Sequence, residues 1–254
     1  MRTRETRMSD ITLSLAITAT FVLAGAIKGV TGMGLPTVAM GILGSLISPM
    51  AAAGMLLLPS FLTNIFQLYE GGNLAALLKR LWPMMLTIVL GTLGSSSLLA
   101  SGSSHATTVA LGIALIVYAL WTLFARPLHV PARHERWLSP LIGLLTGLLT
   151  GGTGVFVIPA VPYIQSLGLE RDELVQALGL SFTFSTLALA AGLWWHGALQ
   201  EIAISTSVTA VVAALIGLFA GQRIRKRISP LAFKRGFLIC LVLLGGDMVL
   251  RALI

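Results

Sequence analysis

Two glycine-rich stretches decide how this chain is interpreted. Residues 25–36 read Gly-Ala-Ile-Lys-Gly-Val-Thr-Gly-Met-Gly-Leu-Pro, and residues 147–159 read Gly-Leu-Leu-Thr-Gly-Gly-Thr-Gly-Val-Phe-Val-Ile-Pro. At the constant offset that separates Gly25 from Gly147, two further glycines and a threonine also match. Glycines at this density disfavour a continuous helix. Paired breaks at corresponding places in two apolar halves predict a transporter whose substrate site lies at the breaks.

Composition places the chain in a membrane. Of its 254 residues, 56% are hydrophobic and 10% are charged, with a mean hydropathy of +0.92. A soluble domain carries about 25% charged residues. The formal net charge is +8, and the basic residues lie in short loops beside apolar segments, as the positive-inside pattern requires. Because no basic patch is interleaved with aromatic residues, we expect no nucleic-acid partner.

Segment length predicts the topology. One helix over residues 11–48 would be ~57 Å long, whereas the hydrocarbon core is ~30 Å thick. This segment, and likewise 138–168, is therefore expected to form a broken helical hairpin that enters and leaves on one side. Three transmembrane helices follow each hairpin, so each half crosses an odd number of times. The prediction is an all-α polytopic membrane protein with two inverted repeats.

The predicted division is a first transmembrane repeat over 1–125, a basic connecting loop over 126–137 and a second repeat over 138–254. Basic loops at 70–80, 126–137 and 223–227 then lie inside, with both termini outside. If each hairpin were one crossing, 223–227 would face the side opposite to 126–137. Arginines before residue 8 do not fit. They resemble a signal peptide, but cleavage would remove Gly25. We expect a bacterial inner-membrane location.

The breaks are expected to bind an anion near the membrane midplane. A half-helix that begins there exposes free N–H groups and the positive end of its dipole. Threonine hydroxyls would add donors and cap the second arms. The alternative is that the glycines only permit close helix packing. The candidate substrate-binding residues are Lys28, Gly29, Thr31, Gly32, Gly34, Thr150, Gly151, Gly152, Thr153 and Gly154.

Charged and polar residues inside apolar segments are the other candidates. An ionisable residue in a membrane suggests function, so Lys28 is expected to attract the anion, the alternative being a lysine that snorkels to an interface. Asp247 and Arg251 are four residues apart and predict a structural ion pair, with a proton-coupling carboxylate as the alternative. Candidate pathway residues are Asn64, Gln67, Ser181, Thr183 and Ser185.

Enzyme signatures are missing from the sequence. There is no HExxH motif, no Cys/His cluster and no nucleotide-binding loop. We therefore predict no catalytic residues, no metal and no cofactor. A membrane-embedded lipid-phosphate enzyme would need acidic, Arg and Ser/His residues clustered at the break. A secondary carrier or a passive anion channel fits better.

On these residues the chain resembles the sulfite exporter TauE/SafE family of membrane permeases. The resemblance rests on residues 24–34, on residues 143–154 and on their duplication within a chain of this length. It implies a secondary transporter of small inorganic or organic anions, sulfite or organosulfonates, that works by alternating access. Proton coupling and oligomeric state stay open. The second copy has Thr150 where the first has Lys28.

Overall fold

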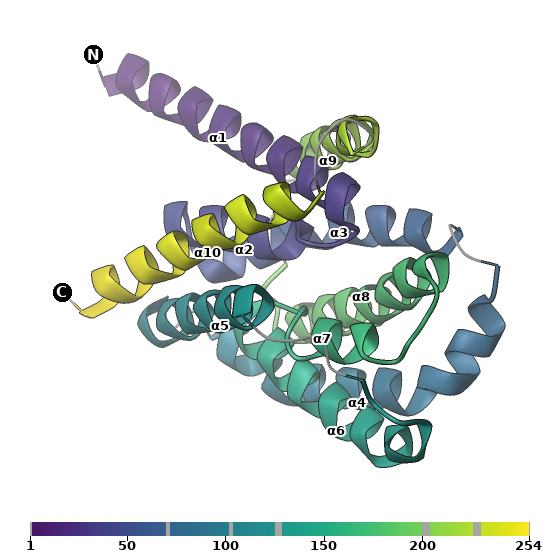
Figure 1. Cartoon of the computed structure of the whole chain (residues 1–254). Coiled ribbons are helices and arrows are strands. Elements are labelled where there is room, and N and C mark those ends of the chain that lie inside the picture. The colour runs from purple at the N-terminus through teal and green to yellow at the C-terminus, as the bar shows by residue number, and fades with distance from the viewer. Residues whose placement is uncertain are drawn as a thin grey trace.

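A computed structural model describes residues 2–69, 72–101, 104–124, 129–199, 204–225 and 230–253, with the side chains of 2–10, 104, 204–206, 230–234 and 253 left out. All the regular structure in these ranges is α-helical (Figure 1), which confirms the all-α class. The helices are α1 (Arg2–Thr31), α2 (Leu35–Leu46), α3 (Pro49–Tyr69), α4 (Leu74–Ala100), α5 (Ser104–Phe124), α6 (Ala132–Thr153), α7 (Ala160–Gln165), α8 (Arg171–Trp195), α9 (Ile204–Ile224) and α10 (Pro230–Leu253).

Six helices in the described part of the chain are long and apolar enough to cross a bilayer. They are α3, α4, α5 and α8, together with Ile11–Thr31 of α1 and Ser207–Ile224 of α9. Large apolar side chains such as Leu90 and Leu243 are more than half exposed on the outside of the bundle. The chain is therefore an integral membrane protein whose outer surface suits hydrocarbon.

The first break is shorter than the glycine pattern predicts. Helix α1 continues through Gly25 and Gly29 and ends at Thr31. The backbone then turns at Gly32 and Gly34, whose φ angles of 78° and 107° favour glycine. Helix α2 begins directly afterwards. The helix is therefore interrupted, as expected, but only over residues 32–34.

The second break follows the same pattern and then differs. Helix α6 continues through Gly147 and Gly151 to Thr153, and Gly154 has a φ of 74°. Residues 155–157 follow without helical structure and are buried. Helix α7 has only 6 residues, whereas α2 has 12. The second returning arm is therefore largely non-helical backbone.

Helix packing explains why the early glycines stay helical. A Cβ atom added to Gly25 or Gly29 would come within 3.0 Å of the backbone of α9. One added to Gly147 or Gly151 would come equally close to the backbone of α4. Contacts this short do not occur for real Cβ atoms, so these four positions require glycine. The packing alternative is correct for them.

The pairs of helices follow the repeat. Helix α1 packs on α9 and α6 packs on α4, while α3 pairs with α8 and α5 with α10 (Figure 1). The offset between Gly25 and Gly147 relates α1 to α6, α4 to α9, α3 to α8 and α5 to α10. Exchanging the two halves therefore converts the α1–α9 pair into the α6–α4 pair and leaves the α3–α8 and α5–α10 pairs unchanged. The pairing supports two repeats, and their inversion and the boundaries at 126–137 stay predictions.

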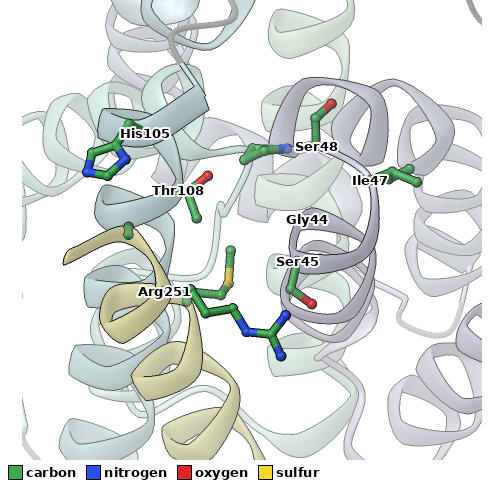
Figure 2. A pocket seen from close by; sticks show the side chains of 10 residues that line it. Gly44, Ser45, Ile47, Ser48, His105, Thr108 and Arg251 are labelled. Carbon is green, nitrogen blue, oxygen red and sulfur yellow. The ribbon is translucent and has the colours of Figure 1, made fainter. Parts of the chain in front are cut away.

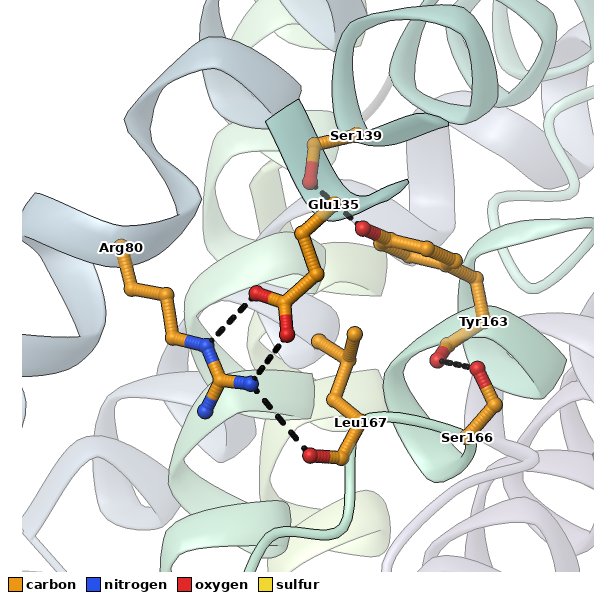
Figure 3. Close-up of polar contacts among 6 residues, drawn as sticks. All are labelled: Arg80, Glu135, Ser139, Tyr163, Ser166 and Leu167. Atoms are coloured by element: carbon orange, nitrogen blue, oxygen red, sulfur yellow. Dashed lines mark hydrogen bonds and ion pairs between the residues drawn. The ribbon is translucent and has the colours of Figure 1, made fainter. Parts of the chain in front are cut away.

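One end of the bundle carries a network of charged side chains. At this end, Arg80 at the start of α4 forms two bonds to Glu135 at the start of α6, with N···O distances of 2.8 and 2.6 Å. Its Nη2 also donates to the Leu167 carbonyl oxygen at 3.3 Å, after α7 (Figure 3). This network joins the second turn of α4 and the first turn of α6 to the connection between α7 and α8. Because Lys79 and Arg80 lie in the second turn of α4 and Arg133 lies in the first turn of α6, we refer to this end as the basic end.

A polar cavity marks the opposite end. It has a volume of about 250 Å³ and is lined by Ile47 after α2, His105 of α5 and Arg251 of α10 (Figure 2). If each hairpin were a single crossing, the end of α2 and the end of α10 would lie on opposite sides. Their meeting in one cavity favours the hairpin topology. The orientation in a membrane stays a prediction.

Candidate functional site

Lys28 is buried inside the bundle. Its side chain is only 2% exposed. The ammonium donates hydrogen bonds to the Thr63 hydroxyl oxygen, at 3.1 Å, and to the side-chain amide oxygen Oδ1 of Asn64. It also lies 5.9 Å from the ring centroid of Phe182, within cation–π range. The snorkelling alternative is therefore wrong, because the ammonium is held by residues of α3 and α8 rather than by an interface.

The sequence of α3 builds the polar face that holds this lysine. Ser60, Thr63, Asn64 and Gln67 follow the spacing i, i+3, i+4 and i+7, so they lie on one side of the helix. All four are buried. Burying an ammonium is unfavourable unless it is hydrogen-bonded. The hydroxyl and amide oxygens solvate the charge of Lys28 without cancelling it.

A small cavity lies beside Lys28. Its volume is about 20 Å³, roughly enough for one water molecule. The other polar side chains on its wall come from α3 and from the end of α9: Thr63, Gln67, Gln222 and Arg225. Gly29 and Gly32 line it as well. Two cationic side chains and two amides therefore surround one space, which we call the Lys28 cavity.

Gly32 connects the first break to the Lys28 cavity. Gln67 donates from Nε2 to the Gly32 carbonyl oxygen at 2.6 Å. This bond fixes the turn against α3. The cavity also includes Val175 of α8. The first break thus lies where α1, α3, α8 and α9 meet.

The two threonines end the first arms of the hairpins. The Thr31 hydroxyl donates to the Ile27 carbonyl oxygen at 2.8 Å and accepts from the Met33 N–H at 3.3 Å. The Thr153 hydroxyl makes the same pair of bonds, to Leu149 at 2.6 Å and from Val155 at 3.2 Å. The expectation that they cap the second arms is therefore corrected. In this conformation both hydroxyls are used by the turns themselves.

The two breaks do not meet. A Cβ added to Gly32 would lie 3.9 Å from Gln67, near the end of α3. One added to Gly154 would lie 2.8 Å from Met40 and 3.4 Å from Ala53, near the start of α3. Residues 53 and 67 are ~21 Å apart along a helix. The expected midplane cradle between facing breaks is therefore not formed in this conformation, because both first arms run almost the full length of their partners.

The remaining candidates of the second break pack locally. The Thr150 hydroxyl donates to the Thr146 carbonyl oxygen at 2.7 Å. A Cβ on Gly152 would lie 3.9 Å from Leu98, near the end of α4. At the first break, Gly34 faces Ile27 and Phe237. Of the ten substrate-binding candidates, the structure brings Lys28, Gly29 and Gly32 to the Lys28 cavity.

Phe182 lies between Lys28 and the second break. The centroid of its ring lies 5.5 Å from that of Phe156, a residue of the non-helical segment, and 5.9 Å from the Lys28 ammonium. The side chain is fully buried. A single aromatic ring therefore contacts both the cationic group and the second break.

The pathway candidates fall into two groups. Asn64 donates to the Thr186 hydroxyl oxygen at 3.4 Å, joining positions that the repeat offset relates, and Thr183 bonds back to its own helix. The other group is buried and has polar atoms without a partner in the described part of the chain. A buried polar atom of this kind needs an explanation. Among the candidates these atoms are Oγ of Ser181 and Ser185 and Oε1 of Gln67, and Ser60 and Thr92 carry hydroxyls of the same kind.

Sequence reasoning missed part of this site. Thr63 carries a weak signal, because it is adjacent to Asn64 in a polar stripe. Arg225 was assigned only to the positive-inside pattern, and nothing in the sequence joins it to Lys28. Phe182 gives no signal at all among many apolar residues. A group of three or more His, Cys, Asp or Glu that could hold a metal does not occur among the described residues.

Comparison with known families covers almost all of the chain. The family described as sulfite exporter TauE/SafE matches residues 17–248. The chain belongs to this family. The matched range of this TauE/SafE protein includes both breaks, Lys28 and Arg225. Comparisons with curated proteins and with solved structures gave no match. Family membership establishes a membrane transport protein.

Proposed function

We propose that the chain is a secondary transporter of small anions, of the sulfite or organosulfonate class, and that the anion binds in the Lys28 cavity. The observation that carries this proposal is the buried Lys28 ammonium, which shares its cavity with the Arg225 guanidinium and two amides. An anion placed between the two cations would gain charge-assisted hydrogen bonds. The low dielectric of the bundle strengthens this attraction.

The basic end would deliver the anion. Arg225 lies at the end of α9, one residue beyond the helix. Clusters of one sign raise the local concentration of the opposite ion. Because about 20 Å³ is too small for a sulfonate, the cavity must widen before binding. A carrier that changes shape during transport satisfies this requirement.

The rest of the route would use the partnerless hydroxyls of α3 and α8. Ser60, Ser181 and Ser185 are buried on the two helices that cross at Asn64 and Thr186. Phe182 lies between Lys28 and the second break, so its ring would have to move as the anion passes. Alternating access by one repeat moving against the other provides such a motion.

The two alternative functions, a passive channel and a lipid-phosphate enzyme, require different structural features. A passive channel needs a continuous path, whereas the Lys28 cavity is only about 20 Å³ and the buried Phe182 ring lies between Lys28 and Phe156 of the second break. A lipid-phosphate enzyme needs an acid or base at the site, and the buried set among the described side chains includes no Asp, Glu or His. The carrier hypothesis therefore has the stronger support.

Counterflow tests the proposal. Proteoliposomes loaded with unlabelled sulfite, sulfoacetate, thiosulfate or a small carboxylate would be diluted into labelled anion. A carrier accumulates label transiently when its substrate is inside, whereas a channel does not. No counterflow with any sulfur oxyanion or sulfonate would contradict the proposed substrate class. Repeating the assay with an imposed pH gradient tests proton coupling.

A matched pair of variants tests the site. Arg225→Gln should raise the KM for the anion, because Arg225 lines the cavity. Arg223→Gln removes an exposed charge two residues away and should leave the KM close to the wild-type value. Equal effects of the two variants would show that only the general charge of this end matters.

A further inference from the structure

A second cavity lies outside the proposed transport route, between α5, α6 and α7. Its volume is about 360 Å³, and nearly all of its wall consists of apolar atoms. Its apolar wall includes Val117 and Trp121 of α5, Leu138 and Ile142 of α6, and Ile158 and Pro162 around the start of α7. We call it the α5–α7 cavity.

The α5–α7 cavity opens on the outer surface of the bundle. Val117 and Trp121 are each 48% exposed, so its α5 wall faces outward. An ordered water needs two to four polar partners, which this apolar wall does not supply. In an integral membrane protein, the material that reaches such an opening is lipid hydrocarbon. An acyl chain is therefore the occupant that fits its chemistry.

The polar boundary of the cavity lies toward the basic end. Tyr163 and Ser166 line it, and they belong to the region of the Arg80–Glu135 network (Figure 3). The Tyr163 and Ser139 hydroxyls lie 2.6 Å apart, and the Val130 N–H bonds to the Ser166 carbonyl oxygen at 3.0 Å. An apolar space thus ends at a layer of polar and charged groups, as a lipid tail does below its headgroup.

Nearby basic residues favour a negatively charged headgroup. Arg133 and Arg136 are exposed in the first turns of α6, the helix that supplies Leu138 to the wall. Exposed Trp137 and Trp121 lie at the same end, where tryptophan marks a membrane interface. Basic sites between transmembrane helices bind anionic lipid headgroups. We propose that the α5–α7 cavity binds an acyl chain of an anionic phospholipid.

This lipid would support the weakest element of the second hairpin. Helix α7 has only 6 residues and follows a non-helical segment, so few of its own backbone bonds hold it in place. Ile158 and Pro162 contact the cavity directly. A bound acyl chain would complete the packing of this arm. The proposal does not depend on which anion is transported.

Lipid retention is the first test. The full chain would be purified in detergent, incubated with phosphatidylglycerol or phosphatidylcholine, washed and analysed for bound phospholipid by mass spectrometry. Wild-type protein should retain phosphatidylglycerol preferentially. Ile142→Trp fills the cavity and should abolish retention. Leu145→Trp, on the same helix but 44% exposed and outside the cavity, should retain the lipid. Equal retention by all three proteins would overturn the proposal.

Fluorescence gives a second test that needs no cavity-filling variant. Phosphatidylglycerol with brominated acyl chains should quench Trp121 more strongly than brominated phosphatidylcholine at the same concentration. The difference between the two lipids should disappear in Trp121→Phe. Equal quenching by both lipids in the wild-type protein would overturn the preference for an anionic headgroup, and a difference that persists in Trp121→Phe would place the lipid elsewhere.

Discussion

The two hairpins have the same kind of turn after their first arms but differ in the charged residues beside it. In each, a long first arm packs its glycines against another helix, a threonine ends that arm, and a glycine with positive φ starts the break. The first hairpin then adds Lys28 and a cavity that contains Arg225. The second has Thr150 at the matching position, bonded to its own helix.

This difference separates the structural role of the repeat from its binding role. The duplicated residues build two similar breaks at different levels of α3, near Gln67 and near Ala53. Lys28 and Arg225 place positive charge beside only one of these breaks. Duplication therefore identifies the hairpins, whereas the departure from duplication marks the proposed binding site. Four predictions test this distinction.

The largest effect is expected at the shared helix interfaces. Gly25→Ala and Gly147→Ala should each destabilise the protein by about 1–3 kcal/mol or more, the cost of overpacking. Both Cβ atoms would collide with the backbone of the partner helix. Thermal unfolding in detergent measures the effect, with Gly94→Ala as the control because nothing lies within 4 Å of its added Cβ. Wild-type stability of Gly25→Ala would contradict the packing described.

The next effect distinguishes two positions related by the repeat offset. Asn64→Leu removes a hydrogen bond to the buried ammonium, which is worth about 1.5–3 kcal/mol. Thr186→Val removes its weak 3.4 Å bond from Asn64 and its 2.7 Å bond to the Phe182 carbonyl oxygen, and should cost about 1 kcal/mol. Chemical unfolding monitored by tryptophan fluorescence compares them. Equal losses of unfolding free energy in the two variants would contradict the claim that Asn64 of α3 contributes more than Thr186 of α8.

The two threonines that end the first arms should behave alike. Thr31→Val and Thr153→Val each lose a hydroxyl bond to a carbonyl one turn earlier. Each should lower the free energy of unfolding by about 1 kcal/mol, and anion affinity should change little in either folded variant. If Thr31→Val alone lost affinity, its hydroxyl would be a ligand and the assignment as a cap would be wrong.

The smallest effect is expected at the ion pair of α10. Asp247 and Arg251 form this pair, which confirms the prediction made from their spacing. Their N···O distance is 2.9 Å, but the side chains are 44% and 73% exposed. Asp247→Asn should therefore change stability by about 0.5 kcal/mol or less. The pH dependence of transport should also be unchanged in proteoliposomes. A loss of that dependence in stable protein would make Asp247 the coupling carboxylate.

Much of the fold was accessible from the sequence, because apolar length and duplicated glycines depend on local chemistry. The breaks were predicted, but they begin at Gly32 and Gly154 rather than at the first glycines. The difference arises from the partner helices, since Gly25 and Gly147 are held by α9 and α4. The sequence singles out Lys28 as a charge inside an apolar segment. The positions of its neighbours Arg225 and Phe182 depend on tertiary contacts between distant helices, which the sequence does not reveal.

The most direct test is the affinity of the purified protein for sulfite in two matched variants. Lys28→Met should weaken binding by at least about tenfold, or ~1.4 kcal/mol. Thr150→Val, at the corresponding position of the second hairpin, should stay near wild type. Isothermal titration of proteins with verified folding, with Lys28→Arg retaining part of the affinity, gives the comparison. Wild-type affinity in folded Lys28→Met, or equal losses in both variants, would contradict a binding site built around one lysine.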